Sequence, residues 1–371
     1  MPVTEEEVLQ ALRPVEDPQL HGSIVELGLV RRVDVGGRRR PGVDVVVALV
    51  FPESPADELR RRVTEALSGL DGVGRIGVDL VVLSDPERDD LARHLEESRS
   101  SPIPMAEAGA KTRVLLVASG KGGVGKSSVT VNVAVALARR GKRVCVVDAD
   151  VWGFSIPAML GIDRPPVILG NRLLLPPEAH GVACASIGFF VREDQAVVWR
   201  GPMLHKALEQ FLTDFWWGEP DFLLVDLPPG TGDISLSLAS FVPRAEAYVV
   251  TTPQPAAQRV AQRAGLMFQS EKINLAVHGV IENMSWFTGD DGKRYELFGS
   301  GGGQVLADRL GVPLVGRIPL VPAVREGGDQ GRPVVVAEPE SEAAASFASI
   351  AGRIDEELAP TRRYRSELRV V

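Results

Sequence analysis

Cysteine is scarce in this sequence, since Cys145 and Cys184 are the only two among 371 residues. Two thiols that lie far apart in the chain cannot build a disulfide framework. Long apolar runs are also missing: stretches such as residues 45–51 are far shorter than the 18 or more residues that read as a membrane-spanning helix. No long block of Lys or Arg is present, and the net charge is −8. A non-specific grip on nucleic acid or on an anionic membrane is therefore not expected.

A signal-peptide pattern is lacking as well. The first ten residues, MPVTEEEVLQ, are acidic and do not lead into an apolar run. Together with the low cysteine content, this predicts a soluble, cytoplasmic protein.

What the sequence does contain is typical of a globular protein with a sizeable core, because 44% of the residues are hydrophobic and 24% are charged. The length predicts two or three domains. Residues 1–85 read as a small α+β domain, with apolar residues at helical spacing in 56–70 and strand patterns in 43–51 and 72–83. Residues 86–112 read as a charged helix and a linker, and residues 361–371 form a basic tail.

The large region between them, residues 113–360, alternates short apolar runs with helical patterns. Fully apolar strands separated by helices predict an α/β fold, in which a mostly parallel sheet is covered by helices on both faces. Ligands of such sheets bind beyond the carboxyl ends of the strands. We expect strands in six segments: residues 113–119, 143–150, 221–228, 245–252, 276–283 and 313–319.

The segment SGKGGVGKSS follows the first of these strands and contains the phosphate-loop pattern G-x-x-x-x-G-K-S. Glycines let successive backbone N–H groups approach a phosphate at the start of the helix. Lys126 would supply a positive charge to the outer phosphates and Ser127 a hydroxyl ligand for Mg²⁺. The competing interpretation is a glycine-rich turn without a ligand. The predicted nucleotide-binding residues of this loop are Gly120, Lys121, Gly122, Gly123, Val124, Gly125, Lys126, Ser127 and Ser128.

Polar residues at three strand ends complete the predicted site. Asp148 and Asp150 close one strand and Asp226 closes another, where a carboxylate can orient Mg²⁺ directly or through water. Taken singly, each could instead be a helix cap or a solvated turn residue. Asn283 ends a further strand and carries an amide suited to an adenine edge. A guanine-reading N-K-x-D element is absent from the sequence, which favours ATP over GTP.

Lys121 is a second lysine in the loop, directly after its first glycine. It could be a solvated loop charge. Alternatively, it could contact a phosphate, either within its own chain or across a dimer.

These residues resemble a known family. GKGGVGKS, with its extra Lys121, is similar to the deviant phosphate loop of the MinD/ParA/nitrogenase-iron-protein class of ATPases. The segments VDADVWGFSIPAMLG, VWRGPMLHKALEQF, WGEPDFLLVDLPPGTGDISLSL, TTPQPAAQRVAQRA and IENMSWF resemble the Mrp/ApbC family of iron–sulphur cluster carrier ATPases. The N-terminal segments DPQLHGSIVELGLV and GVGRIGVDL resemble the small iron–sulphur assembly domain that often precedes these ATPases.

The resemblance implies a role for each matching residue. The loop would bind Mg·ATP, Lys126 would act in catalysis, and Lys121 would reach the nucleotide of the partner subunit in a homodimer. Asp150 would position the attacking water. Ser127, Asp148 and Asp226 would hold Mg²⁺ and its water shell. The partners would be apoprotein clients or iron–sulphur assembly factors.

One departure from the family pattern bears on the cargo. Cluster-carrying members place a C-x-x-C pair after the E-N-M-S motif, whereas this chain has Gly289 and Gly292 there and Ser54 near the place of an N-terminal cysteine. An iron–sulphur cluster needs thiolates, and Cys145 and Cys184 both read as core residues.

Two functions therefore stay open, with a weaker third. The first is an ATP-hydrolysing iron–sulphur cluster carrier that uses unusual ligands or those of a partner. The second is an ATP-driven dimer switch or adaptor that binds client proteins without ligating a cluster. The third is positioning on DNA or a membrane, for which the basic tail is the one supporting feature.

Overall fold

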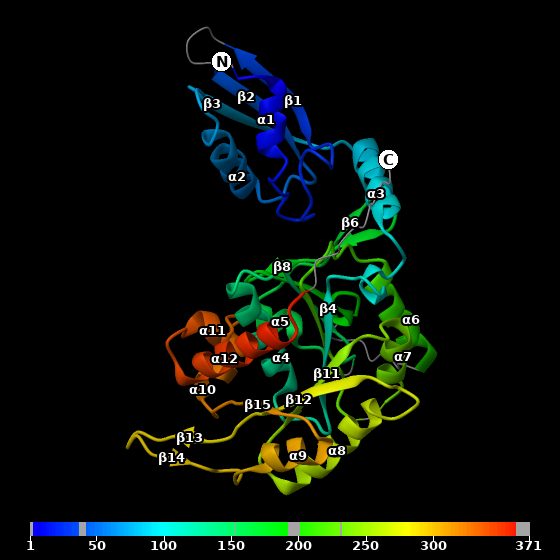
Figure 1. The fold of residues 1–371 in the computed structure, drawn as a ribbon, viewed down its shortest axis with the longest axis vertical. Helices are drawn as coiled ribbons and strands as arrows, with labels where there is room; N and C mark the ends of the chain where they lie inside the picture. Colours follow the sequence, from blue (N-terminus) through cyan, green and yellow to red (C-terminus); the bar gives the residue numbers. More distant parts are fainter. Residues whose placement is uncertain (1–2, 37–41, 152, 192–200, 231, 361–371) are drawn as a thin grey trace, which may run out of the picture. The chain divides into compact units, whose positions relative to one another are not determined.

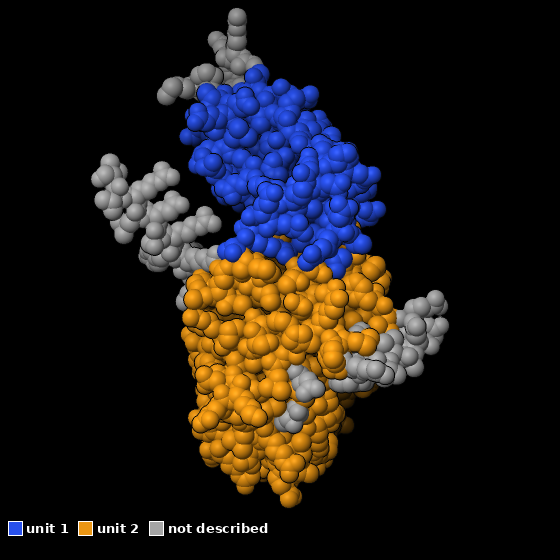
Figure 2. All heavy atoms as spheres, turned by 90° about the vertical axis from the view of Figure 1, so that its right-hand side faces the viewer, with its two compact units in different colours: residues 1–100, 168–175 blue, residues 101–167, 176–371 orange. Residues whose placement is uncertain are grey.

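The computed structural model describes residues 3–36, 42–151, 153–191, 201–230 and 232–360. The chain forms two compact units (Figures 1 and 2). Unit 1 comprises residues 1–100 and 168–175, and unit 2 comprises residues 101–167 and 176–371. The expected basic tail, residues 361–371, lies outside the described residues.

Unit 1 is a three-stranded sheet with helices. The strands lie in the order β1-β2-β3, with β1 and β2 antiparallel and β2 and β3 parallel. α1 begins with a capping box, in which Thr4 and Glu7 exchange hydrogen bonds, and α2 buries one apolar stripe. The elements are α1 (Glu5–Leu12), β1 (Val30–Gly36), β2 (Gly42–Leu49), α2 (Ala56–Ser68), β3 (Ile76–Val82) and α3 (Asp85–Ser98).

Unit 1 also holds a short hairpin from the middle of the chain, formed by β6 (Val167–Leu169) and β7 (Leu173–Leu175). The hairpin turn lies against α3, because a Cβ built on Gly170 would be 2.7 Å from the Cβ of Ala92. Leu169, Leu173 and Leu175 of the hairpin and the apolar stripe of α3 are buried. The helix that we expected in a separate charged segment therefore packs as part of unit 1.

Unit 2 is built on an eight-stranded sheet with the order β15-β12-β11-β4-β10-β5-β9-β8. Every pair from β15 to β9 is parallel, and β8 runs antiparallel to β9. The predicted α/β class and all six predicted strands are confirmed. The strands are β4 (Arg113–Ser119), β5 (Val144–Asp148), β8 (Glu178–Ala179), β9 (Val182–Ser186), β10 (Phe222–Asp226), β11 (Glu246–Thr251), β12 (Ala276–Glu282) and β15 (Leu314–Arg317).

Helices cover both faces of this sheet (Figure 1). One face carries α4 (Lys126–Arg139), α5 (Ile156–Leu160), α10 (Pro322–Asp329), α11 (Val334–Ala337) and α12 (Glu342–Glu357). The other face carries α6 (Gly201–Thr213), α7 (Asp233–Phe241), α8 (Pro255–Phe268) and α9 (Gly302–Leu310). Short 3₁₀ turns occur at Pro104–Ala106 and Ile187–Phe189.

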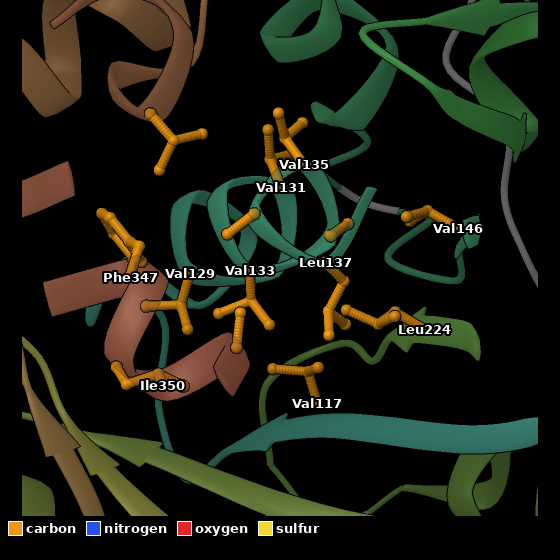
Figure 3. Packing of buried hydrophobic residues seen from close by; sticks show 14 of the residues in the cluster. Val117, Val129, Val131, Val133, Val135, Leu137, Val146, Leu224, Phe347 and Ile350 are labelled. Carbon is orange, nitrogen blue, oxygen red and sulfur yellow. The ribbon is translucent and has the colours of Figure 1, made fainter. Parts of the chain in front are cut away.

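The core of unit 2 centres on α4, which packs on the sheet and against α12. Val129, Val133 and Leu137 of α4 pack among Val117 and Leu224 of the sheet (Figure 3). Phe347 and Ile350 of α12 pack beside Val129 in the same cluster (Figure 3). This packing fixes the first turn of α4, and with it the phosphate loop, at the carboxyl ends of the strands. Among the described helices, none is long and apolar enough to cross a membrane.

Candidate functional site: the phosphate loop and its carboxylates

Three glycines of the loop between β4 and α4 occupy positions that other residues cannot take without strain. Gly123 and Gly125 have φ angles of 77° and 78°, in the left-handed region that glycine tolerates. A Cβ on Gly120 would lie 2.2 Å from backbone atoms of Val260 and Ala261 on α8. The loop therefore packs directly on α8 at one end and turns left-handed into α4 at the other.

The loop encloses a cavity of about 190 Å³. Most of the residues predicted to bind the nucleotide line it, and Asp150 lies on its wall, whereas Gly120 lies against α8. The lining residues are Ser119, Lys121, Gly122, Gly123, Val124, Gly125, Lys126, Ser127, Ser128, Asp150, Ser155, Met159 and Pro229.

The Asp226 carboxylate lies beneath this cavity and is fully buried. Its Oδ2 atom accepts a hydrogen bond from Lys126 Nζ at 2.6 Å and another from Ser127 Oγ at 2.6 Å. A hydroxyl and a carboxylate oxygen are the hard donors that Mg²⁺ prefers, and here they lie side by side. Ser127 and Asp226 therefore fit a magnesium ion at the edge of the phosphate cavity.

Asp148 is placed differently from the expectation that it would share in this metal site. Its Oδ2 accepts hydrogen bonds from Ser186 Oγ at 3.1 Å and from the backbone N–H groups of Ser155 and Ile156 at 3.1 and 3.3 Å. The carboxylate thus holds the start of α5 and the end of β9, and makes no contact with Ser127 among the described hydrogen bonds. Burial, and the nearby charge of Asp226, raise the pKa of Asp148 to about 7.

Asp150 and Lys121 both reach the cavity from outside the helix. Asp150 Oδ2 lies 3.9 Å from Lys126 Nζ, and the Asp150 side chain is 14% exposed. Lys121 Nζ lies 3.5 Å from Oε1 of Gln254, the residue at the start of α8. The ammonium group of Lys121 is thus directed toward α8, while that of Lys126 is held at Asp226.

Asn283 lies behind the loop. Its Nδ2 donates a hydrogen bond to the carbonyl oxygen of Val124 at 2.9 Å, and its Oδ1 accepts one from Met284 N at 2.9 Å. The side chain is 5% exposed. In this structure its amide supports the phosphate loop, and the adenine contact that we predicted stays a prediction.

The sequence interpretation missed three polar residues that fix the site. Thr130 Oγ1 donates a hydrogen bond to Asp226 Oδ1 at 2.6 Å, Ser186 binds Asp148, and Gln254 faces Lys121. A signal existed for Thr130, because it follows Lys126 by one helical turn and so shares its face of α4. Ser186 and Gln254 gave no comparable signal, since their proximity arises from the order of the strands.

Both cysteines are buried, on the adjacent strands β5 and β9 of the eight-stranded sheet. Burial raises the pKa of the Cys145 thiol to about 12 and that of Cys184 well above its usual value. Both sulphurs are thus held as neutral core thiols, as the sequence predicted.

At the place of the family's C-x-x-C pair the chain forms the hairpin of β13 (Phe287–Thr288) and β14 (Arg294–Tyr295), which projects from unit 2 (Figure 1). Asp291 lies in its turn and accepts hydrogen bonds from Lys293 N at 3.0 Å and Tyr295 Oη at 2.9 Å. These bonds lower the pKa of Asp291. Within the described ranges, no group of three or more His, Cys, Asp or Glu side chains could hold a metal ion.

Comparison with family models assigns both parts of the chain. Residues 110–355 match the NUBPL iron-transfer P-loop NTPase family. Residues 5–78 match the iron-sulfur cluster assembly protein family. The first match covers most of unit 2, and the second lies within unit 1.

Relatives and solved structures agree with these matches. The chain is 47% identical to an iron-sulfur cluster carrier protein of Mycobacterium leprae over 89% of this chain and 87% of the relative. It is 42% identical to one from Synechocystis over 95% and 97%. A nucleotide-binding protein from Archaeoglobus fulgidus, solved with ADP, is 34% identical and covers 67% of this chain and 98% of its own, with a TM-score of 0.56. The cell division ATPase MinD of Pyrococcus furiosus is 27% identical over 66% and 99%, with a TM-score of 0.51. The chain therefore belongs to the iron–sulphur cluster carrier family of P-loop NTPases.

Proposed function

We propose that this protein is a cytoplasmic homodimer that hydrolyses Mg·ATP and uses the cycle to assist transfer of iron–sulphur clusters to apoproteins. The observation that carries the ATPase is that Lys126, Ser127 and Asp150 line one cavity at the start of α4, with Asp226 bonded to the first two. Family membership and the carrier relatives support the cluster-related role.

Each group in the cavity has a task that follows from its chemistry. The N–H groups of the loop and the N-terminus of α4 favour bound phosphate, and Lys126 adds a full positive charge. Mg²⁺, held by Ser127 and Asp226, would supply further charge neutralisation at the phosphates. Asp150 lies on the cavity wall as an acceptor, where it would orient a water for in-line attack. Lys121 would add charge to the phosphates of the partner subunit.

Two substitutions test the nucleotide site. Lys126→Ala removes the main cation facing the outer phosphates, so we expect ATP affinity, measured by calorimetry, to fall by about a hundredfold or more. Asp150→Ala leaves those contacts in place, so ATP should bind with near-native affinity while turnover is lost. Native affinity in Lys126→Ala, or native turnover in Asp150→Ala, would contradict the assignment.

A second candidate function is an adaptor that carries a client protein without ligating the cluster through its own thiols. The observation favouring it is the burial of both cysteines in neighbouring strands, with raised thiol pKa values. Four thiolates across a twofold axis would need two exposed cysteines per chain, and this chain offers none.

Anaerobic reconstitution with iron and sulphide distinguishes the two functions. We expect little iron and sulphide to remain after desalting, and we expect native thiols to be inert to a thiol reagent that titrates both after denaturation. A stoichiometric cluster that survives desalting in the wild type and is lost in Cys184→Ser would refute the adaptor and establish an unconventional carrier.

A further inference from the structure

The buried side chain of Thr130 lies under the phosphate site without reaching the cavity. It is fully buried on α4 and is absent from the cavity lining. Its hydroxyl lies 2.6 Å from Oδ1 of Asp226 and 3.0 Å from the carbonyl oxygen of Lys126. The shorter contact joins a hydroxyl to a carboxylate, which is the stronger, charge-assisted type of hydrogen bond.

The three donors around Asp226 divide between its two oxygens. Lys126 and Ser127 both donate to Oδ2, whereas Thr130 donates to Oδ1. Within the described residues no other hydrogen bond reaches the Oδ1 atom. Because Asp226 is fully buried, water has little access to replace a missing donor there.

We infer that Thr130 is a positioning residue that keeps the Asp226 carboxylate turned toward Ser127 when Lys126 leaves it for the nucleotide. The inference rests on the proposed function, in which Lys126 Nζ moves from Asp226 to the phosphates. Asp226 then loses one of its two partners at Oδ2, while the bond at Oδ1 stays because Thr130 touches no ligand. The remaining Oδ2 lone pairs are thereby held beside Ser127, where the magnesium ion fits.

Paired substitutions separate the hydroxyl from the packing. Thr130→Val keeps the β-branched shape but lacks the hydroxyl. Thr130→Ala lacks both the hydroxyl and the methyl group, whereas Thr130→Ser keeps the hydroxyl. Because Thr130→Val loses a buried hydrogen bond to a charged group, we expect its affinity for Mn²⁺ in the presence of ADP to fall by about tenfold or more. The measurement is Mn²⁺ titration followed by electron paramagnetic resonance.

ADP affinity in EDTA is the internal control. We expect it to stay within about twofold of wild type in all three variants, because Thr130 touches no nucleotide. The Mg²⁺ concentration for half-maximal ATPase should rise in Thr130→Val and Thr130→Ala, and Thr130→Ser should restore it. Unchanged Mn²⁺ affinity in Thr130→Val overturns the inference, and so does an equal loss of ADP affinity without metal. Failure of the wild type to bind Mn²⁺ and ADP together overturns the proposed function itself.

Discussion

Two buried carboxylates at the ends of neighbouring strands have different roles because different hydrogen-bond donors surround them. Asp148 and Asp226 are register partners at the ends of β5 and β10, and both are fully buried. Asp226 faces the ammonium of Lys126, whereas Asp148 faces a hydroxyl and backbone N–H groups. Without a cation of its own, Asp148 has its pKa raised to about 7 by burial and by the charge of Asp226. Its contacts with Ser155 and Ile156 hold the start of α5, next to the cavity of the phosphate loop.

Asp148 should make the stability of the nucleotide-free protein depend on pH. Its folded pKa of about 7 lies above the ordinary value of 3.8, so the native state holds the proton more tightly than the unfolded state. The contribution of Asp148 to stability is therefore full at low pH and is lost as pH rises through that window toward about 7. We expect the free energy of unfolding in urea to fall less between pH 5 and pH 8 in Asp148→Asn than in wild type, by a few kcal/mol at most.

Taking the difference between the two pH profiles cancels the contribution of every titratable group that does not interact with Asp148. Glu7 and Glu87, whose pKa values are lowered by hydrogen bonds, affect both proteins alike. Parallel profiles for wild type and Asp148→Asn would show that the Asp148 carboxylate titrates normally.

At the scale of elements, the sequence predicted six strands of the large sheet, from the edge strand β15 to β5, and missed β9 and β8 at the other edge. β5 and β10 were predicted because strands buried on both faces read as continuous apolar runs. β9 reads VACAS, whose alanines and serine lack the β-branched pattern, although it is equally buried. β6 and β7 have three residues each, which is too short to show the alternation of apolar and polar residues that indicates a strand. Their place in unit 1 depends on packing against α3, which no local pattern encodes.

The hairpin of β6 and β7 offers a test of that packing. Gly170 has a φ of +63°, and a Cβ there would lie 2.7 Å from the Cβ of Ala92 on α3. Gly170→Ala therefore adds a steric overlap to the cost of a left-handed alanine, which is roughly 1 kcal/mol. We expect faster amide hydrogen exchange in residues 85–98, measured by mass spectrometry.

Gly141→Ala is the matched control, because Gly141 has a φ of +80° and nothing within 4 Å of its Cβ position. It should lose a similar amount of stability from backbone strain and leave the exchange of α3 unchanged. Equal exchange of α3 in both variants would show that the hairpin does not support this helix.

For the molecule as a whole, the two lysines of the phosphate loop differ in what their ammonium groups contact. Lys126 is anchored at Asp226, while Lys121 lies on the cavity wall with its ammonium toward Gln254. The spacing of Lys121 from Lys126 alone left a role within its own chain equally open, whereas the family resemblance implies that Lys121 serves the partner subunit. The side-chain position of Lys121, away from Asp226, is consistent with that role and calls for a test in a mixed dimer.

Mixing Lys121→Ala chains with Asp150→Ala chains provides that test. If Lys121 acts across the dimer, the heterodimer contains one site with both defects and one site with neither. Random pairing makes half of the dimers mixed, so ATPase activity should return to about a quarter of wild type. If Lys121 acts within its own chain, every site keeps one defect and the mixture stays inactive.

The control for this mixture is Lys126→Ala combined with Asp150→Ala. Lys126 and Asp150 lie in the same cavity of one chain, 3.9 Å apart, so both defects stay in their own sites whichever chains pair. This mixture should therefore remain inactive even though heterodimers form, which native mass spectrometry can verify. If ATPase activity recovers in the Lys121→Ala mixture but not in the Lys126→Ala mixture, one subunit completes the ATP site of the other. If heterodimers form and neither mixture recovers, Lys121 does not act across the dimer, and its contact with Gln254 becomes the place to look for its role.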